Sequence, residues 1–185
     1  MVVYGIQHPK ARSLTLPLLE RAARLYWGIF PPLRLERTQQ GKPFFPEYPD
    51  CHFNVSHSGD LIVCALDRAP VGVDIQIPRP SRTAFLDRLC TPEERAWLAD
   101  RHDSPDAFAL LWSMKESRCK WSGQGLTRPI ANIAVPLPRS GERQLSLDGL
   151  TFSLRAGSGW QLCLCSTDPW DGEIQWLTDR IDIEE

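Results

Sequence analysis

Three short segments of this 185-residue chain place polar side chains where the packing of an apolar core would not require them. Phe53–Gly59 reads FNVSHSG and combines hydroxyl groups with an imidazole, whereas Val71–Gln76 reads VGVDIQ and sets a carboxylate inside an apolar run. Trp112–Lys120 reads WSMKESRCK and sets a carboxylate among basic side chains. Groups of these kinds can bind anions, hold a metal ion or transfer protons.

The carboxylate of Asp74 is the group that most needs an explanation. With the period of two of a strand, Asp74 and Gln76 share one face, while Val73 and Ile75 share the other. A carboxylate among apolar neighbours needs a partner, because burying an unpaired charge is costly. That partner is either a basic side chain or a divalent cation, and the strand alone does not distinguish them.

The other two segments also admit a functional and a structural interpretation. The backbone N–H groups of Phe53–Gly59 and His57 could bind an anion, or Ser56 and its neighbours could bond to their own backbone in a capped turn. Trp112, Glu116 and Lys120 recur every four residues and therefore line one side of a helix. Glu116 and Lys120 could act in a site or form an ordinary surface pair worth about 0.3 kcal/mol.

The elements that must position these groups follow from periodicity and turn signals. Apolar residues at helical spacing predict a helix over Leu16–Phe30, ended by Pro31-Pro32. Leu61–Leu66 and Val71–Ile77 are predicted to pair as strands through a turn at 67–70. Further strands are predicted at 2–6, 33–38, 160–165 and 174–177.

Capping signals predict the ends of the later helices. One helix is predicted over 82–89, and Thr91 to Glu94 forms the capping box of the next. Ser104-Pro105 opens the longest helix, which runs to Ser122 and ends at Gly123. Asp148-Gly149 predicts a tight hairpin within 145–151. Each half thus offers a helix and about three strands, which predicts an α+β protein built from two similar halves.

Composition excludes several classes of protein. Lys plus Arg number 21 and Asp plus Glu 23, for a net charge of −2, and 42% of the residues are hydrophobic. Such values are typical of a folded domain and not of a nucleic-acid-binding protein. The longest apolar run, Leu61–Leu66, is far shorter than the ~20 residues of a membrane span. The first residues lack the pattern of a signal peptide, so we expect a soluble, cytoplasmic protein.

Charges and cysteines are unevenly distributed. Residues 1–42 hold seven basic and two acidic side chains, a balance of +5, whereas residues 166–185 hold one basic and seven acidic, a balance of −6. The basic segment either binds phosphate or is a solvated surface. The six cysteines form no CxxC pair, and we expect reduced thiols.

Taken in order, the three segments resemble the 4′-phosphopantetheinyl transferases, of the larger, monomeric, surfactin-synthetase-activator-like kind. Gly41-Lys42-Pro43 before them and Gly123-Gln124-Gly125 after them fit the same pattern. The resemblance covers residues 10–126, and the remainder matches only as a β-rich tail. It implies two similar α/β halves related by pseudo-twofold symmetry, residues 1–77 and 78–185, with the site between them.

The resemblance implies transfer of 4′-phosphopantetheine from coenzyme A to a serine of an apo acyl, polyketide or peptidyl carrier protein, with release of adenosine 3′,5′-bisphosphate. Asp74 and Glu116 beside a pyrophosphate would set like charges about 4 Å apart, and each pair would cost about 4 kcal/mol at an effective dielectric of 20. A divalent cation is therefore required, and all-oxygen ligands favour Mg²⁺.

Roles for individual residues follow from the same resemblance. Asp74 and Glu116 are the expected metal ligands, and Glu116 is also the general base for the serine hydroxyl. Lys120, helped by Lys115, would neutralise charge on the leaving phosphate. The family member compared carries Glu where this chain has Gln76, which we expect to reach the metal through water or not at all. Coenzyme A is expected to contact Ser56 and His57 at the pyrophosphate, Lys42 and Pro43 at the adenine, and Arg12 or Lys10 at the 3′-phosphate.

Two other functions remain open at this point. A Mg²⁺-dependent hydrolase of nucleotide pyrophosphates would use the same Asp74 and Glu116. A non-catalytic module that binds coenzyme A or a carrier protein is favoured by the neutral Gln76. Two halves in one chain also favour a monomer, since each half supplies what a partner subunit otherwise would.

Overall fold

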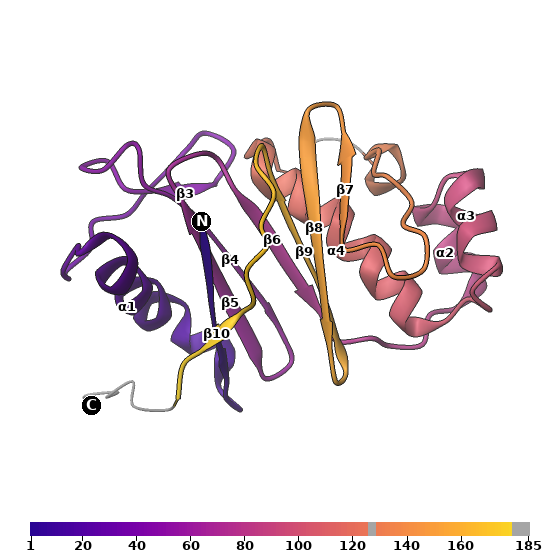
Figure 1. Cartoon of the computed structure of the whole chain (residues 1–185), viewed down its shortest axis with the longest axis horizontal. Coiled ribbons are helices and arrows are strands. Elements are labelled where there is room, and N and C mark those ends of the chain that lie inside the picture. The colour runs from indigo at the N-terminus through magenta and orange to yellow at the C-terminus, as the bar shows by residue number, and fades with distance from the viewer. Residues whose placement is uncertain (126–128, 179–185) are drawn as a thin grey trace.

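Two four-stranded sheets form the centre of the molecule, with a helix on the outer side of each (Figure 1). The structure is a computed structural model that describes residues 1–125 and 129–178. One apolar cluster lies between the sheets and includes Val63 of the first and Leu164 of the second. Two further clusters lie under the outer helices. The architecture confirms the predicted α+β class, while the symmetry between the halves stays a prediction.

The first sheet has the order β10-β1-β5-β4. Its strands are β1 (Val2–Gln7), β4 (His52–Ser58), β5 (Leu61–Asp67) and β10 (Gln175–Trp176). Helix α1 (Thr15–Trp27) buries Leu18, Leu19 and Ala22 on its inner side. The helix was predicted to reach Phe30, but it ends at Trp27 because Gly28 adopts the left-handed conformation, with φ of 71°.

The second sheet has the order β6-β9-β8-β7, and all its pairs are antiparallel. Its strands are β6 (Gly72–Gln76), β7 (Gln144–Leu147), β8 (Leu150–Gly157) and β9 (Trp160–Ser166). The predicted hairpin is confirmed, with positive φ at Asp148 and Gly149. Helix α4 (Pro105–Ser122) covers the outer face and has the predicted ends, the Ser104 cap and Gly123.

Short elements complete the chain. They are η1 (Ala11–Leu14), β2 (Glu36–Arg37), β3 (Pro43–Phe44), α2 (Thr83–Leu89), α3 (Pro92–Ala99) and η2 (Ile130–Asn132). The capping box of Thr91 and Glu94 is confirmed. The strand predicted over 33–38 is confined to β2. The final part of the acidic segment, residues 179–185, lies outside the described residues.

Two predicted strand assignments are wrong. β5 does not pair with β6: β5 lies between β1 and β4, while β6 pairs with β9. The connection at 68–71 contains Pro70, which lacks a backbone donor, and it carries the chain from one sheet to the other. β10, expected to complete the second half, instead pairs in parallel with β1. The strand pairing therefore crosses the boundary that we placed after residue 77, and the two domains stay a prediction.

The six cysteines are free thiols, as expected, and all but Cys119 are buried. Cys163 and Cys165 belong to the apolar cluster under α4, where they pack as small core residues. Among the helices of residues 1–125 and 129–178, none has the length and apolar character needed to cross a bilayer.

Candidate active site between the sheets and helix α4

Where the two sheets meet, β4 and β6 are joined by hydrogen bonds from backbone N–H groups to side chains, and not by the backbone-to-backbone hydrogen bonds of a sheet. Alternate residues of β4 accept hydrogen bonds from alternate backbone N–H groups in and just after β6. The donor–acceptor pairs are Val73 to Asn54 at 2.9 Å, Ile75 to Ser56 at 3.3 Å and Ile77 to Ser58 at 3.0 Å. We call this arrangement the β4–β6 seam. These hydrogen bonds provide acceptors for backbone N–H groups on the edge of β6 that does not pair with β9, and they place Asp74 beside β4.

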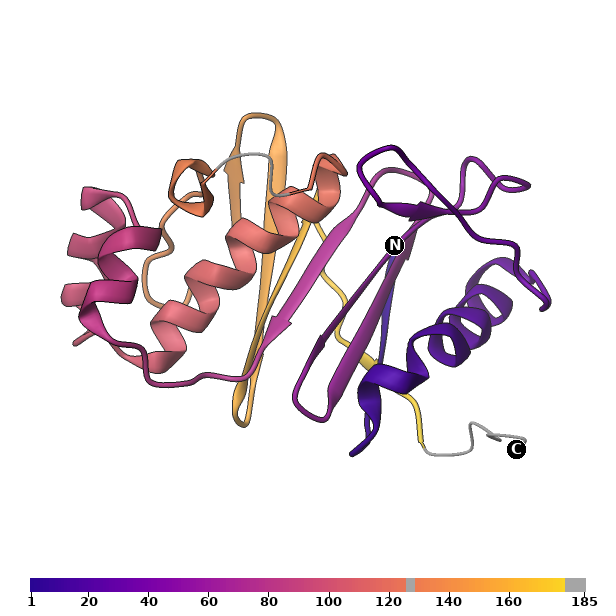
Figure 2. The same cartoon turned by 180° about the vertical axis from the view of Figure 1, so that it is seen from behind.

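Helix α4 approaches the beginning of β6 more closely than any residue with a side chain at position 72 would allow. A Cβ atom on Gly72 would lie 2.1 Å from the carbonyl oxygen of Ser117 and 2.3 Å from the backbone nitrogen of Trp121. The last turns of α4 therefore rest on the strand itself, as the view from behind shows (Figure 2). This contact brings Glu116 and Lys120 to Asp74.

Both carboxylate oxygens of Asp74 have partners. Oδ1 accepts from the Lys120 ammonium at 2.6 Å and from the Ser56 hydroxyl at 2.7 Å, and Oδ2 accepts from the Gln76 amide at 2.7 Å. Asp74 is only 2% exposed, so these donors replace its solvation. The sequence left open whether the partner of Asp74 is a basic side chain or a divalent cation. The ion pair with Lys120 shows that a basic side chain is present.

Glu116 lies close enough to Asp74 and Lys120 for their charges to shift its pKa. Burial raises the pKa of the Glu116 carboxyl group, the Asp74 carboxylate raises it further, and the Lys120 ammonium opposes both effects. A second carboxylate beside a buried one makes a cation favourable at the site. Such a site is a candidate for both metal binding and proton transfer.

The donor set fits Mg²⁺. Among the described residues no group of three or more His, Cys, Asp and Glu side chains could hold a metal ion. Mg²⁺, however, is commonly held by one or two carboxylates together with waters and substrate phosphates. Asp74 and Glu116 supply two carboxylates, while Gln76 uses its N–H to bind Asp74 and leaves only an amide oxygen as a further ligand.

A pocket of about 200 Å³ opens beside Glu116 and Lys120. Both short glycine-containing segments singled out in the sequence contribute to its wall, through Gly41, Lys42, Pro43, Gly123 and Gly125. The structure thus unites segments that lie about 80 residues apart, between Lys42 and Gly123.

Lys42 has a structural role in the wall of this pocket. Its ammonium donates to the carbonyl oxygens of Lys120 at 2.6 Å and Trp121 at 3.0 Å, near the C-terminal end of α4. A cation is favourable there because of the helix dipole. Burial nevertheless lowers the pKa of Lys42 to about 8. Lys42 therefore connects the β2–β3 segment to α4, and both Lys42 and Pro43 line the pocket.

Lys115 does not reach the pocket, which corrects the role expected from the sequence. Its ammonium forms an ion pair with Glu94 of α3 at 2.8 Å and donates to the carbonyl oxygens of Ile130 and Ala131. The side chains of Lys115 and Glu94 are 2% and 5% exposed. Successive residues of a helix are rotated by about 100°, so Lys115 and Glu116 cannot face the same neighbour.

Lys115→Met is expected to lower the free energy of unfolding by about 3–5 kcal/mol, because Glu94 would stay buried without a counter-charge. Urea unfolding followed by far-UV circular dichroism measures the change. Lys10→Met, at an exposed position, is the control. A loss no larger than that of the control would contradict the buried ion pair.

Ser56 and His57, which we expect to contact the pyrophosphate, point to opposite sides of β4. Adjacent residues of a strand point to opposite faces. Ser56 is buried in the β4–β6 seam, whereas His57 is exposed on the side of Phe53, which packs under α1. Arg12 and Lys10 are exposed in and just before η1. Contacts of Ser56, His57, Arg12 and Lys10 with a phosphate stay predictions.

Sequence reasoning missed several residues on which the site depends. Asn54 and Ser58 were overlooked as seam residues, Gly72 as the contact for α4, and Glu94 as the partner of Lys115. The polar residues at 54, 56 and 58 have the period of two of a strand, and that signal could have identified the seam. The tight contact at Gly72 has no counterpart in local sequence.

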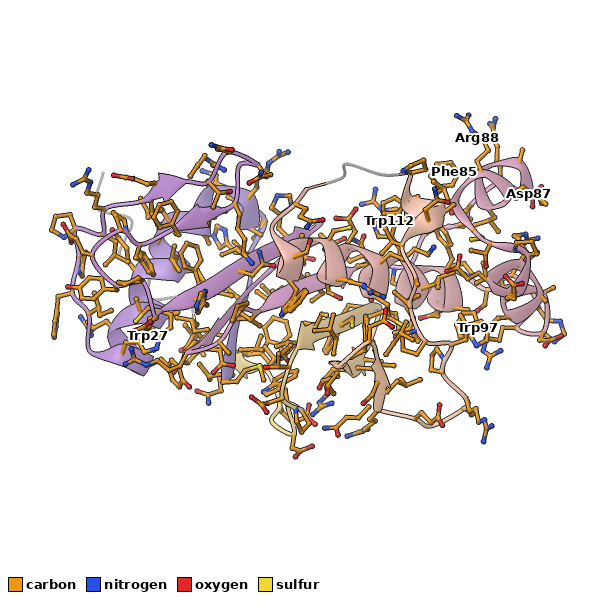
Figure 3. The ribbon with its side chains drawn as sticks, turned by 90° about the horizontal axis from the view of Figure 1, so that it is seen from above. Trp27, Phe85, Asp87, Arg88, Trp97 and Trp112 are labelled. Carbon is orange, nitrogen blue, oxygen red and sulfur yellow. The ribbon has the colours of Figure 1, made fainter. Side chains whose placement is uncertain are left out.

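A second hollow, of about 230 Å³, is lined in part by Gln76. Aromatic side chains from two helices line it: Phe85 of α2, and Phe108 and Trp112 of α4. Figure 3 shows Phe85 and Trp112 on the same side of the molecule. Trp112 therefore continues the helix side of Glu116 and Lys120, as predicted, but borders this hollow and not the first pocket.

Known proteins match the chain over most of its length. The family model of the 4′-phosphopantetheinyl transferase superfamily matches residues 70–168, which include Asp74 and Glu116. A 4′-phosphopantetheinyl transferase of Bacillus subtilis is 36% identical over 160 residues, which cover 82% of this chain and 71% of that protein. The 4′-phosphopantetheinyl transferase Sfp of Bacillus subtilis strain 168 is 33% identical over 144 residues, which cover 74% and 64%.

A third relative is also a 4′-phosphopantetheinyl transferase, with similar identity and coverage. The 4′-phosphopantetheinyl transferase psf-1 of Bacillus pumilus is 34% identical over 155 residues, which cover 77% of this chain and 65% of that protein. The chain thus spans about two thirds of the length of the relatives that it matches.

Proposed function

Because the chain belongs to the 4′-phosphopantetheinyl transferase superfamily, we propose that it transfers the 4′-phosphopantetheine group of coenzyme A to a serine of an apo carrier protein. The second product is adenosine 3′,5′-bisphosphate. The observation that carries the proposal is the cluster of Asp74, Glu116 and Lys120 beside a pocket. Two carboxylates and an ammonium suit a reaction at a pyrophosphate, in which charge must be neutralised and one proton moved.

Asp74 and Glu116 are the residues that would hold Mg²⁺. When bound, the ion supplies positive charge to the pyrophosphate oxygens. The two carboxylates then no longer repel the substrate, since their charge is balanced. Burial raises the pKa of Glu116 and the nearby Asp74 carboxylate raises it further, and the closeness of the two carboxylates supports this assignment.

Glu116 would accept the proton of the attacking serine hydroxyl, directly or through a water. The serine oxygen forms a bond to the phosphorus that carries the pantetheine group, and the bond from this phosphorus to the bridging oxygen breaks. The electron pair of that bond leaves with the bisphosphate. Lys120 would neutralise the leaving oxygen. A base with a raised pKa suits proton abstraction near neutral pH.

The rest of coenzyme A would extend along the pocket wall. Lys42 and Pro43 would flank the adenine, and His57 with Arg12 or Lys10 would bind phosphate. The basic balance of the first 42 residues supports such an anion site. Ser56 would contact the pyrophosphate from the β4–β6 seam, whereas Lys115 is left out of this set because its ammonium is paired with Glu94.

Mass spectrometry of an apo acyl, polyketide or peptidyl carrier protein after incubation with coenzyme A and Mg²⁺ tests the proposal. We expect a gain of one phosphopantetheine, lost in EDTA. No gain with any carrier of the three classes would contradict the proposal. Release of adenosine bisphosphate without a carrier would favour a hydrolase, and binding without turnover would favour a non-catalytic module.

The wider setting is also proposed. We expect the protein to act as a monomer in the cytoplasm, without nucleic acid or membrane, since the candidate site draws its groups from one chain. Size-exclusion chromatography with light scattering tests the oligomeric state. A dimer at micromolar concentration would contradict the expectation.

Gln76→Glu is expected to lower the Mg²⁺ concentration needed for half-maximal transfer by roughly tenfold. A carboxylate at this position adds a potential ligand next to Asp74 and removes the amide that now occupies Oδ2. The same change repels Asp74, so it should also destabilise the metal-free protein. Gln175→Glu, at an exposed position of β10, adds the same charge away from the site and is the control. An unchanged Mg²⁺ dependence would mean that residue 76 does not face the ion.

A further inference from the structure

Near its C-terminal end the chain returns from the second sheet to the first through residues 167–174, which lead from β9 to β10 (Figure 1). We call this segment the strap. Beyond it, β10 pairs with β1, and the N–H of Leu177 donates to the carbonyl oxygen of Gly5 at 2.8 Å. Trp170 and Ile174 of the strap belong to the apolar cluster between the two sheets. The strap therefore connects the two sheets across that cluster.

Arg155 of β8 binds the backbone of the strap. Its guanidinium donates to the carbonyl oxygen of Trp170 at 2.9 Å and to that of Gly172 at 2.7 Å and 2.9 Å, and it lies 4.7 Å from the centre of the Trp170 ring. The Arg155 side chain is only 5% exposed. Buried carbonyl oxygens of irregular backbone need donors from side chains, and the five N–H groups of a guanidinium can serve two carbonyl oxygens at once.

Ser153 holds the same segment from the neighbouring inward position of β8. Its hydroxyl oxygen accepts from the N–H of Trp170 at 3.0 Å. Residues 153 and 155 share one face of the strand, whereas Leu154 between them belongs to the cluster under α4. The strap and α4 therefore lie on opposite faces of the second sheet, as the front and back views show (Figures 1 and 2).

This arrangement controls the angle between the two sheets. β4 and β6 are edge strands that meet in the β4–β6 seam, and β10 forms the opposite edge of the first sheet. The sheets can rotate about the seam, because single hydrogen bonds to side chains join it, and the strap limits that rotation from the other side. The pocket beside Glu116 and Lys120 also takes Lys42 and Asn54 from the first half of the chain, so its width depends on this angle.

We propose that Arg155 is a positioning residue for coenzyme A: by holding the strap, it keeps the two sheets at the angle at which the pocket accepts this ligand. The proposal rests on the proposed function, since it takes coenzyme A as the ligand of the pocket. Without Arg155, only a fraction of the molecules adopts the angle that permits binding, and the apparent affinity falls by that fraction. Saturating coenzyme A restores this angle, so the maximal rate is kept.

Arg143 provides a matched control. Arg143 and Arg155 form ion pairs with the same strap residue, Glu173, at 3.5 Å and 3.4 Å. The side chains of Arg143 and Glu173 are 73% and 69% exposed. Arg143→Met thus removes the same charge beside Glu173 and leaves in place the donors to the strap carbonyl oxygens.

The test combines calorimetric titration with coenzyme A in EDTA and steady-state transfer to an apo carrier protein with Mg²⁺. Arg155→Met is expected to raise the dissociation constant and the KM for coenzyme A about tenfold, with kcat within about twofold of wild type. Arg143→Met should match the wild type. Hydrogen exchange followed by mass spectrometry should be faster in the strap and β10 of Arg155→Met, while α4 and β9 stay protected. Ser153→Ala should raise the same constants less, and it replaces Arg155→Met if that variant does not fold.

Three outcomes would overturn the proposal. A lower kcat with an unchanged KM would mean that Arg155 only stabilises the fold. An unchanged dissociation constant despite faster exchange in the strap would mean that the strap does not set the pocket. An equal change in Arg143→Met would assign the effect to the charge beside Glu173. Failure of the proposed function would look different: wild-type protein would bind coenzyme A and modify no carrier, while the calorimetric comparison of the two arginine variants would still decide the role of Arg155.

Discussion

Replacing Glu116 by glutamine is expected to lower the rate of phosphopantetheine transfer by roughly 10²–10⁴-fold, the usual contribution of a general base. The amide keeps the size of the side chain but cannot accept a proton, and it is a weaker ligand for Mg²⁺ than a carboxylate. Because the amide is neutral, the cost of burying a charge and the repulsion from Asp74, which raise the Glu116 pKa, also disappear. The variant is therefore expected to be slower and, without metal, more stable.

The sign of the stability change follows from the direction of the pKa shift. The pKa of Glu116 is raised above its ordinary value of 4.5 in the folded protein. The folded state therefore binds more protons than the unfolded state in the window just above 4.5, and stability is lost as the pH rises through the raised pKa. At pH 7 the wild type carries this cost and Glu116→Gln does not. The difference should shrink as the pH falls toward 4.5.

Two measurements on the same preparations check this prediction. Transfer to an apo carrier gives the rate, and thermal unfolding in EDTA gives Tm, for which each kcal/mol recovered corresponds to roughly 2–4 °C in a chain of this size. Glu47→Gln, which neutralises an exposed glutamate outside the pocket, is the control. A Glu116→Gln variant that transfers at the wild-type rate would remove Glu116 from the mechanism. A lower Tm would contradict the repulsion between Glu116 and Asp74.

Gly72→Ala is expected to damage both the fold and the activity. The added Cβ would lie 2.1 Å and 2.3 Å from two backbone atoms of α4, and backbone atoms cannot turn away as the end of a side chain can. Overpacking of this kind typically costs about 1–3 kcal/mol. Helix α4 must also shift, and a displacement of about 1 Å lowers catalysis by roughly 10²-fold. Glu116 and Lys120 would both move with the helix.

Urea unfolding and the transfer rate, compared at equal fractions of folded protein, test this prediction. Gly157→Ala is the matched control in the same sheet, because its Cβ would meet the side chain of Trp160 and no backbone atom of α4. We expect the control to keep its activity. Wild-type stability in Gly72→Ala would mean that α4 does not rest on β6 as described.

Local sequence predicted the elements that carry the site, because the signals involved act over a few residues. The Ser104 cap and Gly123 set the ends of α4 through hydrogen bonds with residues three or four positions away. The periods of 2 and 3.6 residues placed Asp74 with Gln76, and Glu116 with Lys120. Residue identity also indicated which of these groups carry charge, so the two carboxylates and the ammonium could be named before their distances were known.

Contacts between distant segments decided the rest. Which lysine of α4 meets Asp74 depends on how the helix is rotated against β6, and the contact at Gly72 sets that rotation. Lys120 consequently binds Asp74, while Lys115 meets Glu94. Likewise, the sheet that receives β6 depends on pairing with β9, about 90 residues further along the chain. No local pattern contains that information.

The sequence by itself thus determined the chemical inventory of this protein, its helices and its family resemblance, since these depend on residue type and short spacing. Only the tertiary structure decided the partner of each charge. Ser56 is the clearest case, because the packing of β4 against β6 places its hydroxyl between Asp74 and Lys120, two groups that lie far from it in the sequence. A buried polar group must take the partners that the fold places around it, and those partners are distant in sequence.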